Sequence, residues 1–108
     1  MKEIEVYITA DGRCPFEEWR CSLSTDFRLR ISKRLRRLEE GNFGDCKRLQ
    51  NSQLSELRLT FGKGYRVYYK ELDNIIILIL AGSDKSDQKK TIKRADEYLQ
   101  DYLTRRKQ

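Results

Sequence analysis

The length and charge of the chain limit what this protein can be. Its 108 residues suffice for one domain with a small core, and 23 Lys and Arg against 17 Asp and Glu give a net charge of +6 at neutral pH. No apolar run approaches the ~20 residues of a membrane-spanning helix, and the charged N-terminus does not resemble a signal peptide. We therefore expect one cytoplasmic domain, residues 1–108, with an anionic partner such as nucleic acid and no membrane association.

The cysteine content argues against disulfides and zinc. The chain has three cysteines and no histidine, so the cysteines cannot all pair internally, and there is no Cys-x-x-Cys motif. We expect Cys14, Cys21 and Cys46 to be reduced structural thiols, with Cys21 on a buried helix face. Neither a metal nor a cofactor is expected.

The first part of the chain predicts a strand followed by a helix. Residues 2–8 alternate apolar with mostly polar side chains, with Ile4, Val6 and Ile8 on one side and Tyr7 on the other, as in a half-buried strand. Pro15 can occupy the first position of a helix. One face of that helix carries Phe16, Trp19 and Leu23, and this spacing favours a core position for Trp19 over a role in base stacking.

A second helix follows after a short link. Ser24-Thr25-Asp26 supplies its cap, its apolar residues recur at helical spacing, and Gly41 ends it. The apolar positions are Phe27, Ile31, Leu35 and Leu38. The rest of the helix is strongly basic, through Arg28, Arg30, Lys33, Arg34, Arg36 and Arg37. This surface is either a solvated face or a contact for a nucleic-acid backbone.

Residues 56–70 predict a β-hairpin. Two alternating strands, residues 56–61 and 65–70, flank Gly62-Lys63-Gly64, and three residues containing glycine are a common hairpin loop. If Phe61 faces Tyr65, then Arg58 faces Tyr68, and one face is apolar through Leu57, Leu59, Phe61, Val67 and Tyr69. The other face carries Arg58, Arg66 and Tyr68. Neighbouring arginines repel each other, so this face is either solvated or binds an anion.

The last third of the chain predicts a central strand and a long helix. Residues 75–81 are all apolar, as in a strand covered on both faces. Asp84 or Ser86 can cap the final helix, which runs to about Arg106 and carries an apolar stripe of Ile92, Ala95, Leu99, Tyr102 and Leu103. Its first turns are basic, through Lys89, Lys90, Lys93 and Arg94. Cations there oppose the helix dipole, so this start is either a phosphate site or a solvated turn.

The predicted order is β-α-α-β-β-β-α, an α+β fold with an antiparallel-rich small sheet. The sequence also resembles a known protein family. The resemblance rests on residues 40–47 (EGNFGDCK), 55–58 (SELR), 62–68 (GKGYRVY) and 81–88 (AGSDKSDQ), with the leading Pro-Phe-x-x-Trp helix. These stretches resemble the addiction-module killer proteins of the RelE/ParE toxin superfamily, close to the HigB-type branch. The resemblance covers nearly the whole chain.

This resemblance implies a fold and a function. The fold would be the RelE-like toxin fold, with two N-terminal helices and a C-terminal helix around the sheet. The protein would be a toxin of a bacterial type II toxin–antitoxin system that cleaves mRNA on the ribosome without a metal. A cognate antitoxin would hold it inactive. The histidines that some HigB-type enzymes use are absent here, which leaves the proton-transfer roles open.

Metal-independent RNA cleavage needs groups that neutralise the phosphate, accept one proton and donate another. Arg66 matches the arginine of the family's Gly-Tyr-Arg strand and is the first candidate for a bidentate phosphate clamp, with Arg58 orienting the same group. Lys47 and Lys85 are the candidates for proton transfer, because neighbouring cations make a lysine easier to deprotonate. Glu56 is the alternative base.

The remaining candidates would bind RNA. Tyr68 would stack on a base or position the ribose, and Gln88 would hydrogen-bond a base edge. Lys89 and Lys90 would contact phosphates.

Two other functions stay open. A ParE-like inhibitor of DNA gyrase would share the fold without needing the basic cluster, and a non-catalytic domain would only bind its antitoxin or a nucleic acid. The mode of inhibition is open as well. The antitoxin would either cover Arg58, Arg66 and Lys85 or dock on the helices and block entry to the ribosome.

Overall fold

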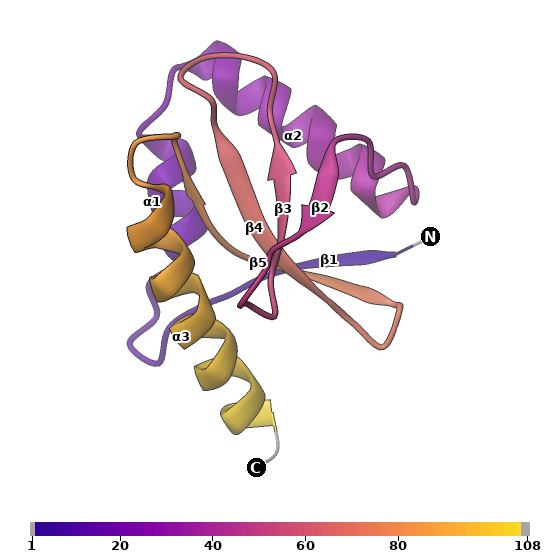
Figure 1. Ribbon diagram of the computed structural model, residues 1–108, viewed down its shortest axis with the longest axis vertical. Helices are drawn as coiled ribbons and strands as arrows, with labels where there is room; N and C mark the ends of the chain where they lie inside the picture. Colours follow the sequence, from indigo (N-terminus) through magenta and orange to yellow (C-terminus); the bar gives the residue numbers. More distant parts are fainter. Residues whose placement is uncertain (1, 107–108) are drawn as a thin grey trace.

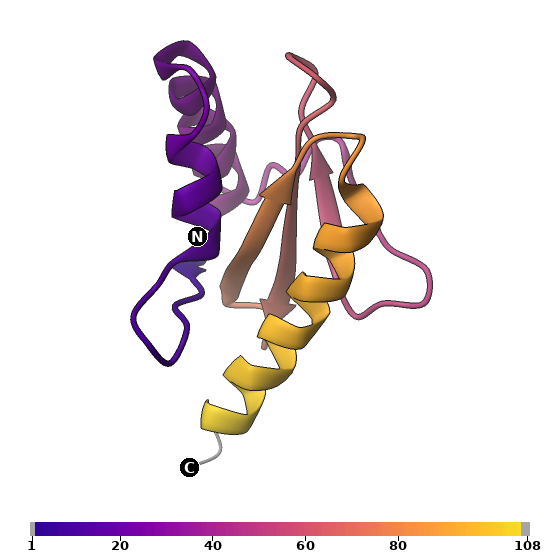
Figure 2. The same ribbon diagram turned by 90° about the vertical axis from the view of Figure 1, so that its left-hand side faces the viewer.

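Helices cover both faces of a five-stranded sheet in the computed structural model, which describes residues 2–106 (Figure 1). The strands are β1 (Glu3–Val6), β2 (Cys46–Arg48), β3 (Ser55–Arg58), β4 (Arg66–Leu72) and β5 (Ile76–Ser83). The helices are α1 (Pro15–Cys21), α2 (Thr25–Glu39) and α3 (Gln88–Arg106). Figure 2 shows α1 and α2 on one side of the sheet and α3 on the other. The predicted α+β class is confirmed.

The sheet contains one strand more than the sequence predicts. Its order is β1-β5-β4-β3-β2, in which β1 and β5 are parallel and all other neighbours are antiparallel. The strand that the prediction omits is β2, a three-residue edge strand whose side chains are mostly exposed. Such a strand has no alternating apolar pattern, and only its pairing with β3 defines it. The observed order is therefore β-α-α-β-β-β-β-α.

The residues predicted to begin α1 and to begin and end α2 do so in the structure. Pro15 occupies the start of α1, and the Ser24 side chain accepts a hydrogen bond from the Phe27 N–H at 3.3 Å to cap α2. α2 ends at Glu39, and Gly41 follows with a φ of +84°. Within residues 2–106, no helix is both long and apolar enough to cross a bilayer.

Two apolar cores lie on opposite faces of the sheet. The core under α1 and α2 contains Phe16, Ile31 and Leu38, packed on residues of β3, β4 and β5. The core under α3 contains Leu54, Leu78, Leu80, Ala95 and Leu99. β5 contributes buried side chains to both, which confirms a strand covered on both faces, although the strand begins at Ile76 and Ile75 is exposed.

The predicted hairpin register is wrong by two residues. Arg58 lies opposite Arg66, and Glu56 lies opposite Tyr68. The connection is longer than three residues, because β3 ends at Arg58 and the Leu59 N–H donates to the Tyr65 carbonyl at 2.9 Å. A shift of two residues leaves every side chain on its predicted face, so the division into an apolar and a basic face is correct.

Two other expectations are also wrong. Tyr7 is buried at 3% exposure and Ile8 is 53% exposed, the reverse of the prediction. Tyr7 does lie on the side opposite Ile4 and Val6, but the core under α3 covers that side, and β1 ends at Val6, before Ile8. The Tyr7 hydroxyl donates to Asp101 at 2.6 Å, and burial together with this bond raises the pKa of Tyr7 to about 12. Cys21 is exposed rather than buried, although all three cysteines are free thiols as expected.

Trp19 contributes to the first core, as its spacing predicts, and it packs closely on Gly82 of β5. A β-carbon at Gly82 would overlap the indole ring. We therefore expect Gly82→Ala to lower the free energy of unfolding by about 1–3 kcal/mol, measured by denaturant titration. In a Trp19→Leu background the same change should cost much less, because the smaller side chain leaves room. An equal cost in both backgrounds would contradict this account.

Candidate phosphate-binding site

A buried carboxylate lies between two arginines on the face of the sheet that α3 covers. Glu56 Oε1 is 3.5 Å from Arg58 Nε and 3.7 Å from Arg66 Nε, and the Glu56 side chain is only 1% exposed. Arg58 and Arg66 are direct cross-strand partners, a pairing of like charges that would be destabilising alone. The sequence left open whether a solvated face or an anion relieves this repulsion. The structure places the protein's own carboxylate there.

The two arginines keep unused hydrogen-bonding capacity. Both Nε atoms are buried, and neither has a hydrogen-bond partner among residues 2–106. Arg66 Nη1 donates to the Gly64 carbonyl at 2.6 Å, and Arg58 Nε is 3.6 Å from Asp45 Oδ1. The Arg58 side chain is 42% exposed and that of Arg66 is 13% exposed. Because both Nε atoms are buried beside Glu56, a phosphate would contact the Nη groups, and the more exposed Arg58 gives the easier access.

The first residue of α3 is bonded to this cluster. Gln88 Nε2 donates to Glu56 Oε2 at 3.1 Å, so the start of the helix lies against the arginine pair. The first turn of α3 contains no acidic residue. Its exposed lysines, with Gln88, surround a surface hollow of about 410 Å³ lined by Lys85, Ser86, Asp87, Gln88, Lys89 and Lys90. The structure thus places the first residue of α3 against the carboxylate that lies between the two arginines.

The turn before α3 is ordered by Asp84. Its carboxylate accepts hydrogen bonds from the Ser86 hydroxyl at 2.6 Å and from the N–H groups of Ser86 and Asp87. The hydrogen bond from the Ser86 hydroxyl lowers the pKa of Asp84 most, and the bonds from the two N–H groups lower it further. Of the two predicted capping residues, Asp84 is the acceptor for this turn. It fixes the path of the chain that carries Lys85.

Two lysines lie on opposite sides of the arginine pair. Lys47 of β2 is the cross-strand partner of Glu56, so it belongs to the same face. Lys85 follows β5 on the other side, and its N–H donates to the Lys63 carbonyl at 3.3 Å. Gly64 separates Lys85 from Arg66, since a β-carbon there would lie 3.3 Å from both Lys85 Cβ and Arg66 Nη1. Glycine at this position therefore allows the two cationic side chains to approach.

One predicted RNA contact is not supported by the structure. Tyr68 is completely buried, which raises the pKa of its hydroxyl, and its ring has no face open to a base. The Gln88 amide donates one hydrogen bond to Glu56, and its contact with a base edge stays a prediction. Tyr68 instead meets Ser83, with 3.0 Å between the two hydroxyl oxygens. The sequence analysis missed Ser83, because it stands in what looked like a turn after the strand.

The comparisons with known proteins identify a relative but no activity. No protein-family model matches the chain. A Haemophilus influenzae protein described only as uncharacterized is 42% identical over 81 residues, which span 74% of this chain and 81% of that protein. The chain belongs to the family of this Haemophilus protein. The relative's description gives the family no function, so function has to be argued from the site.

Proposed function

We propose that this protein is the toxin of a bacterial type II toxin–antitoxin system, with a RelE-like fold and metal-independent endoribonuclease activity on mRNA at the ribosome. Its partners would be the ribosome, mRNA and a cognate antitoxin, and it would act in the cytoplasm. The observation that supports this most is the pair Arg58 and Arg66, which face each other on adjacent strands with a lysine on either side. The sequence resemblance is the second support.

The reaction needs no group from outside the protein and the RNA. The ribose 2′-oxygen attacks the adjacent phosphorus, so an O2′–P bond forms while the P–O5′ bond breaks. One protein group takes the proton of the 2′-OH, and another gives a proton to the leaving 5′-oxygen. The products are a 2′,3′-cyclic phosphate and a 5′-hydroxyl. Arg66 and Arg58 would stabilise the charge that builds on the phosphate oxygens between these events.

The positions of the other side chains support a division of roles. Lys47 and Lys85 flank the arginines from the β2 and β5 sides, so they could reach the attacking and the leaving oxygen from opposite directions. Glu56 lies between the arginines and the first residue of α3, out of contact with solvent. This placement favours Glu56 as a positioning residue that orients the guanidinium groups, rather than as the base.

The experiment that tests this function is cleavage of a reporter mRNA in a translating extract, run beside a gyrase supercoiling assay. The protein should cut the message and leave supercoiling unchanged, and added antitoxin should stop the cutting. Inhibition of supercoiling without RNA cleavage would replace the proposal with a ParE-like function. A folded protein that binds RNA but shows neither effect would be a non-catalytic domain.

The lysines around the start of α3 give a separate prediction. If Lys85, Lys89 and Lys90 contact phosphates, RNA affinity should fall steeply with salt, and the triple alanine variant should reduce the salt slope by up to about one per lost contact. The measurement is RNA binding at several salt concentrations. Replacing Arg36, Lys70 and Arg106 removes as much charge away from the start of α3 and serves as the control. Equal slopes for the parent and the first variant would show that these lysines are only solvated.

A further inference from the structure

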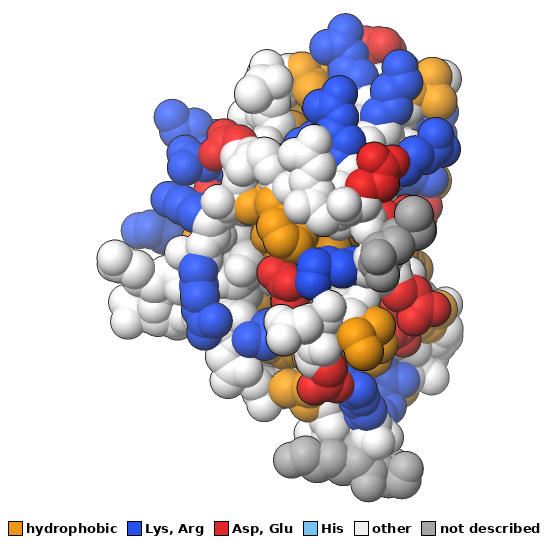
Figure 3. Space-filling model, turned by 90° about the vertical axis from the view of Figure 1, so that its right-hand side faces the viewer, with side chains coloured by type: hydrophobic (Ala, Val, Ile, Leu, Met, Phe, Trp, Pro, Cys, Tyr) orange, Lys and Arg blue, Asp and Glu red, His pale blue; other side chains and the backbone are white. Residues whose placement is uncertain are grey.

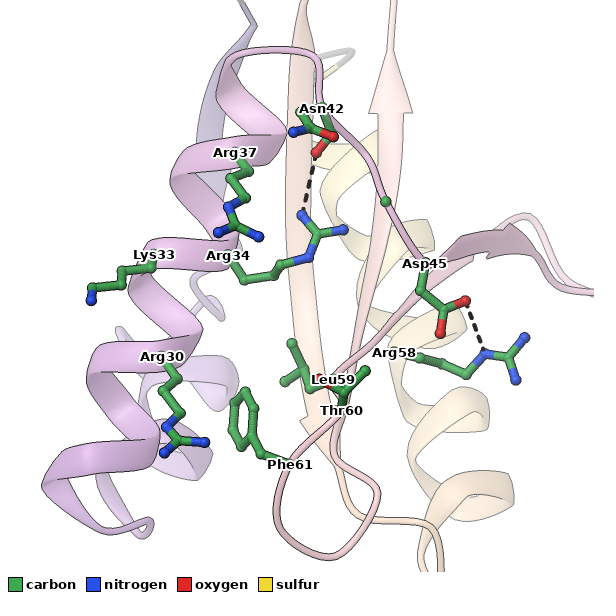
Figure 4. A pocket seen from close by; sticks show the side chains of 11 residues that line it. Arg30, Lys33, Arg34, Arg37, Asn42, Asp45, Arg58, Leu59, Thr60 and Phe61 are labelled. Carbon is green, nitrogen blue, oxygen red and sulfur yellow. Dashed lines mark hydrogen bonds and ion pairs between the residues drawn. The ribbon is translucent and has the colours of Figure 1, made fainter.

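One arginine of α2 crosses to the loop that precedes β2 (Figure 4). Arg34 donates to the Asn42 carbonyl at 3.3 Å and also to the Phe43 carbonyl. Figure 4 shows its side chain reaching across a pocket of about 410 Å³, whereas Lys33 points away from the pocket. Arg34 therefore ties the middle of α2 to this loop.

The surroundings of Arg34 are strongly cationic. Arg30 and Arg37 lie one turn before and one turn after it on α2, and both line the same pocket. Figure 3 shows Lys and Arg side chains gathered toward the upper end of the molecule, where α2 lies. Like charges at this spacing repel each other, which favours an Arg34 side chain that extends into solvent. Its bonds to two carbonyl oxygens offset this repulsion, so the loop is what holds the guanidinium in the pocket.

Gly44 gives the Arg34 guanidinium its place in the loop. A β-carbon at Gly44 would overlap Arg34 Nη2, and its φ of +61° also disfavours other residues. Phe43 anchors the loop on the first core, and the Cys46 N–H donates to the Gly44 carbonyl at 2.9 Å. These contacts fix the path of the chain on both sides of Asp45.

Asp45 connects this loop to the arginine pair. Its carbonyl accepts the Arg58 N–H at 2.9 Å, and its carboxylate Oδ1 is 3.6 Å from Arg58 Nε, the ion pair drawn in Figure 4. Glu56 Oε1 is 3.5 Å from the same Nε, so two carboxylates hold the Nε edge of the guanidinium and leave its Nη groups for a phosphate. The Asp45 side chain is 55% exposed. Its position therefore depends on the loop backbone rather than on packing.

We propose that Arg34 is a positioning residue for the arginine pair, because it fixes the loop from which Asp45 orients the Arg58 guanidinium toward a bound phosphate. Arg34 does not touch the phosphate itself, since it donates to Asn42 and Phe43. The inference rests on the proposed function where cleavage is measured, whereas the contact between Asp45 and Arg58 exists without RNA. A direct RNA contact by Arg34 would instead lower RNA affinity, and the tests below separate the two.

Cleavage on purified ribosome–mRNA complexes at increasing protein concentration separates rate from affinity. Arg34→Ala should lower the limiting rate about tenfold or more and leave the half-saturating concentration nearly unchanged, because a misplaced phosphate ligand costs rate. Arg34→Lys should recover part of the rate, since an ammonium can still donate to a loop carbonyl. Arg37→Ala removes the same charge from the same pocket and keeps the backbone carbonyl that accepts the Asn42 N–H. An equal rise of the half-saturating concentration in both alanine variants, with no loss of limiting rate, would overturn the proposal.

A double-mutant cycle shows whether Arg34 acts through Asp45. Asp45→Asn keeps the shape of the side chain but removes the charge beside Arg58, so it should lower the limiting rate as well. Adding Arg34→Ala to Asp45→Asn should then change the rate by less than about twofold, because both variants disturb the same contact. Losses that multiply would show that Arg34 acts by another route and would overturn the proposal.

A third measurement needs no cleavage. In the ¹⁵N-labelled full chain, the Nε–H signal of Arg58 can be assigned by its loss in Arg58→Lys. Arg34→Ala should shift this signal and speed the exchange of its proton with water, whereas Arg37→Ala should do neither. If the parent cuts no RNA but Arg34→Ala changes the Arg58 signal, the proposed function fails and the positioning role stands. An unchanged Arg58 signal in folded Arg34→Ala would overturn the positioning role even if the parent is an active nuclease.

Discussion

Arg66→Ala is expected to lower the rate of RNA cleavage by about 10²–10³-fold, the usual cost of losing one preorganised stabiliser of transition-state charge. Arg66 is the less exposed member of the arginine pair, and its bond to the Gly64 carbonyl holds the guanidinium in place. The fold should survive, because Glu56 keeps its contacts with Arg58 and Gln88. The measurement is reporter cleavage in a translating extract, with growth arrest in an expressing host as a second readout.

Two further variants serve as controls for Arg66→Ala. Arg66→Lys keeps the charge but loses the planar fork, so it should recover only part of the activity if bidentate contact matters. Arg36→Ala removes an exposed arginine of α2 and should leave the rate unchanged. A folded Arg66→Ala protein that cleaves as fast as the parent would remove Arg66 from the site.

Glu56→Ala is expected to lower the free energy of unfolding by about 2–3 kcal/mol, because it leaves two facing guanidinium groups without the carboxylate between them. Glu56→Gln should cost less, since an amide oxygen can still accept the bond from Gln88. Denaturant titration measures both.

The same variant should gain an anion site. With the carboxylate gone, millimolar sulfate at constant ionic strength should stabilise Glu56→Ala more than the parent, because an anion that binds only the folded state adds to its stability. The comparison with the parent removes the general effect of sulfate on proteins. If Glu56→Ala has the same free energy of unfolding as the parent and sulfate does not raise it further, Glu56 does not offset a repulsion between Arg58 and Arg66.

The sequence predicted most of the local structure of this protein. Proline at the start of α1, serine before α2 and glycine after it act through neighbouring backbone groups, so these limits could be inferred from the chain itself. The apolar stripes of α2 and α3 and the two faces of the hairpin follow from periods of 3.6 and 2, which depend only on residue order. For that reason Arg58 and Arg66 were correctly placed on one face.

Tertiary structure decided which residues meet. Period-2 alternation is unchanged by a two-residue slip, so only pairing within the whole sheet sets Arg58 against Arg66 and Glu56 beside both. β2 exists only as a partner of β3. Tyr68 is buried because α3 packs over it, a long-range contact that no local pattern contains.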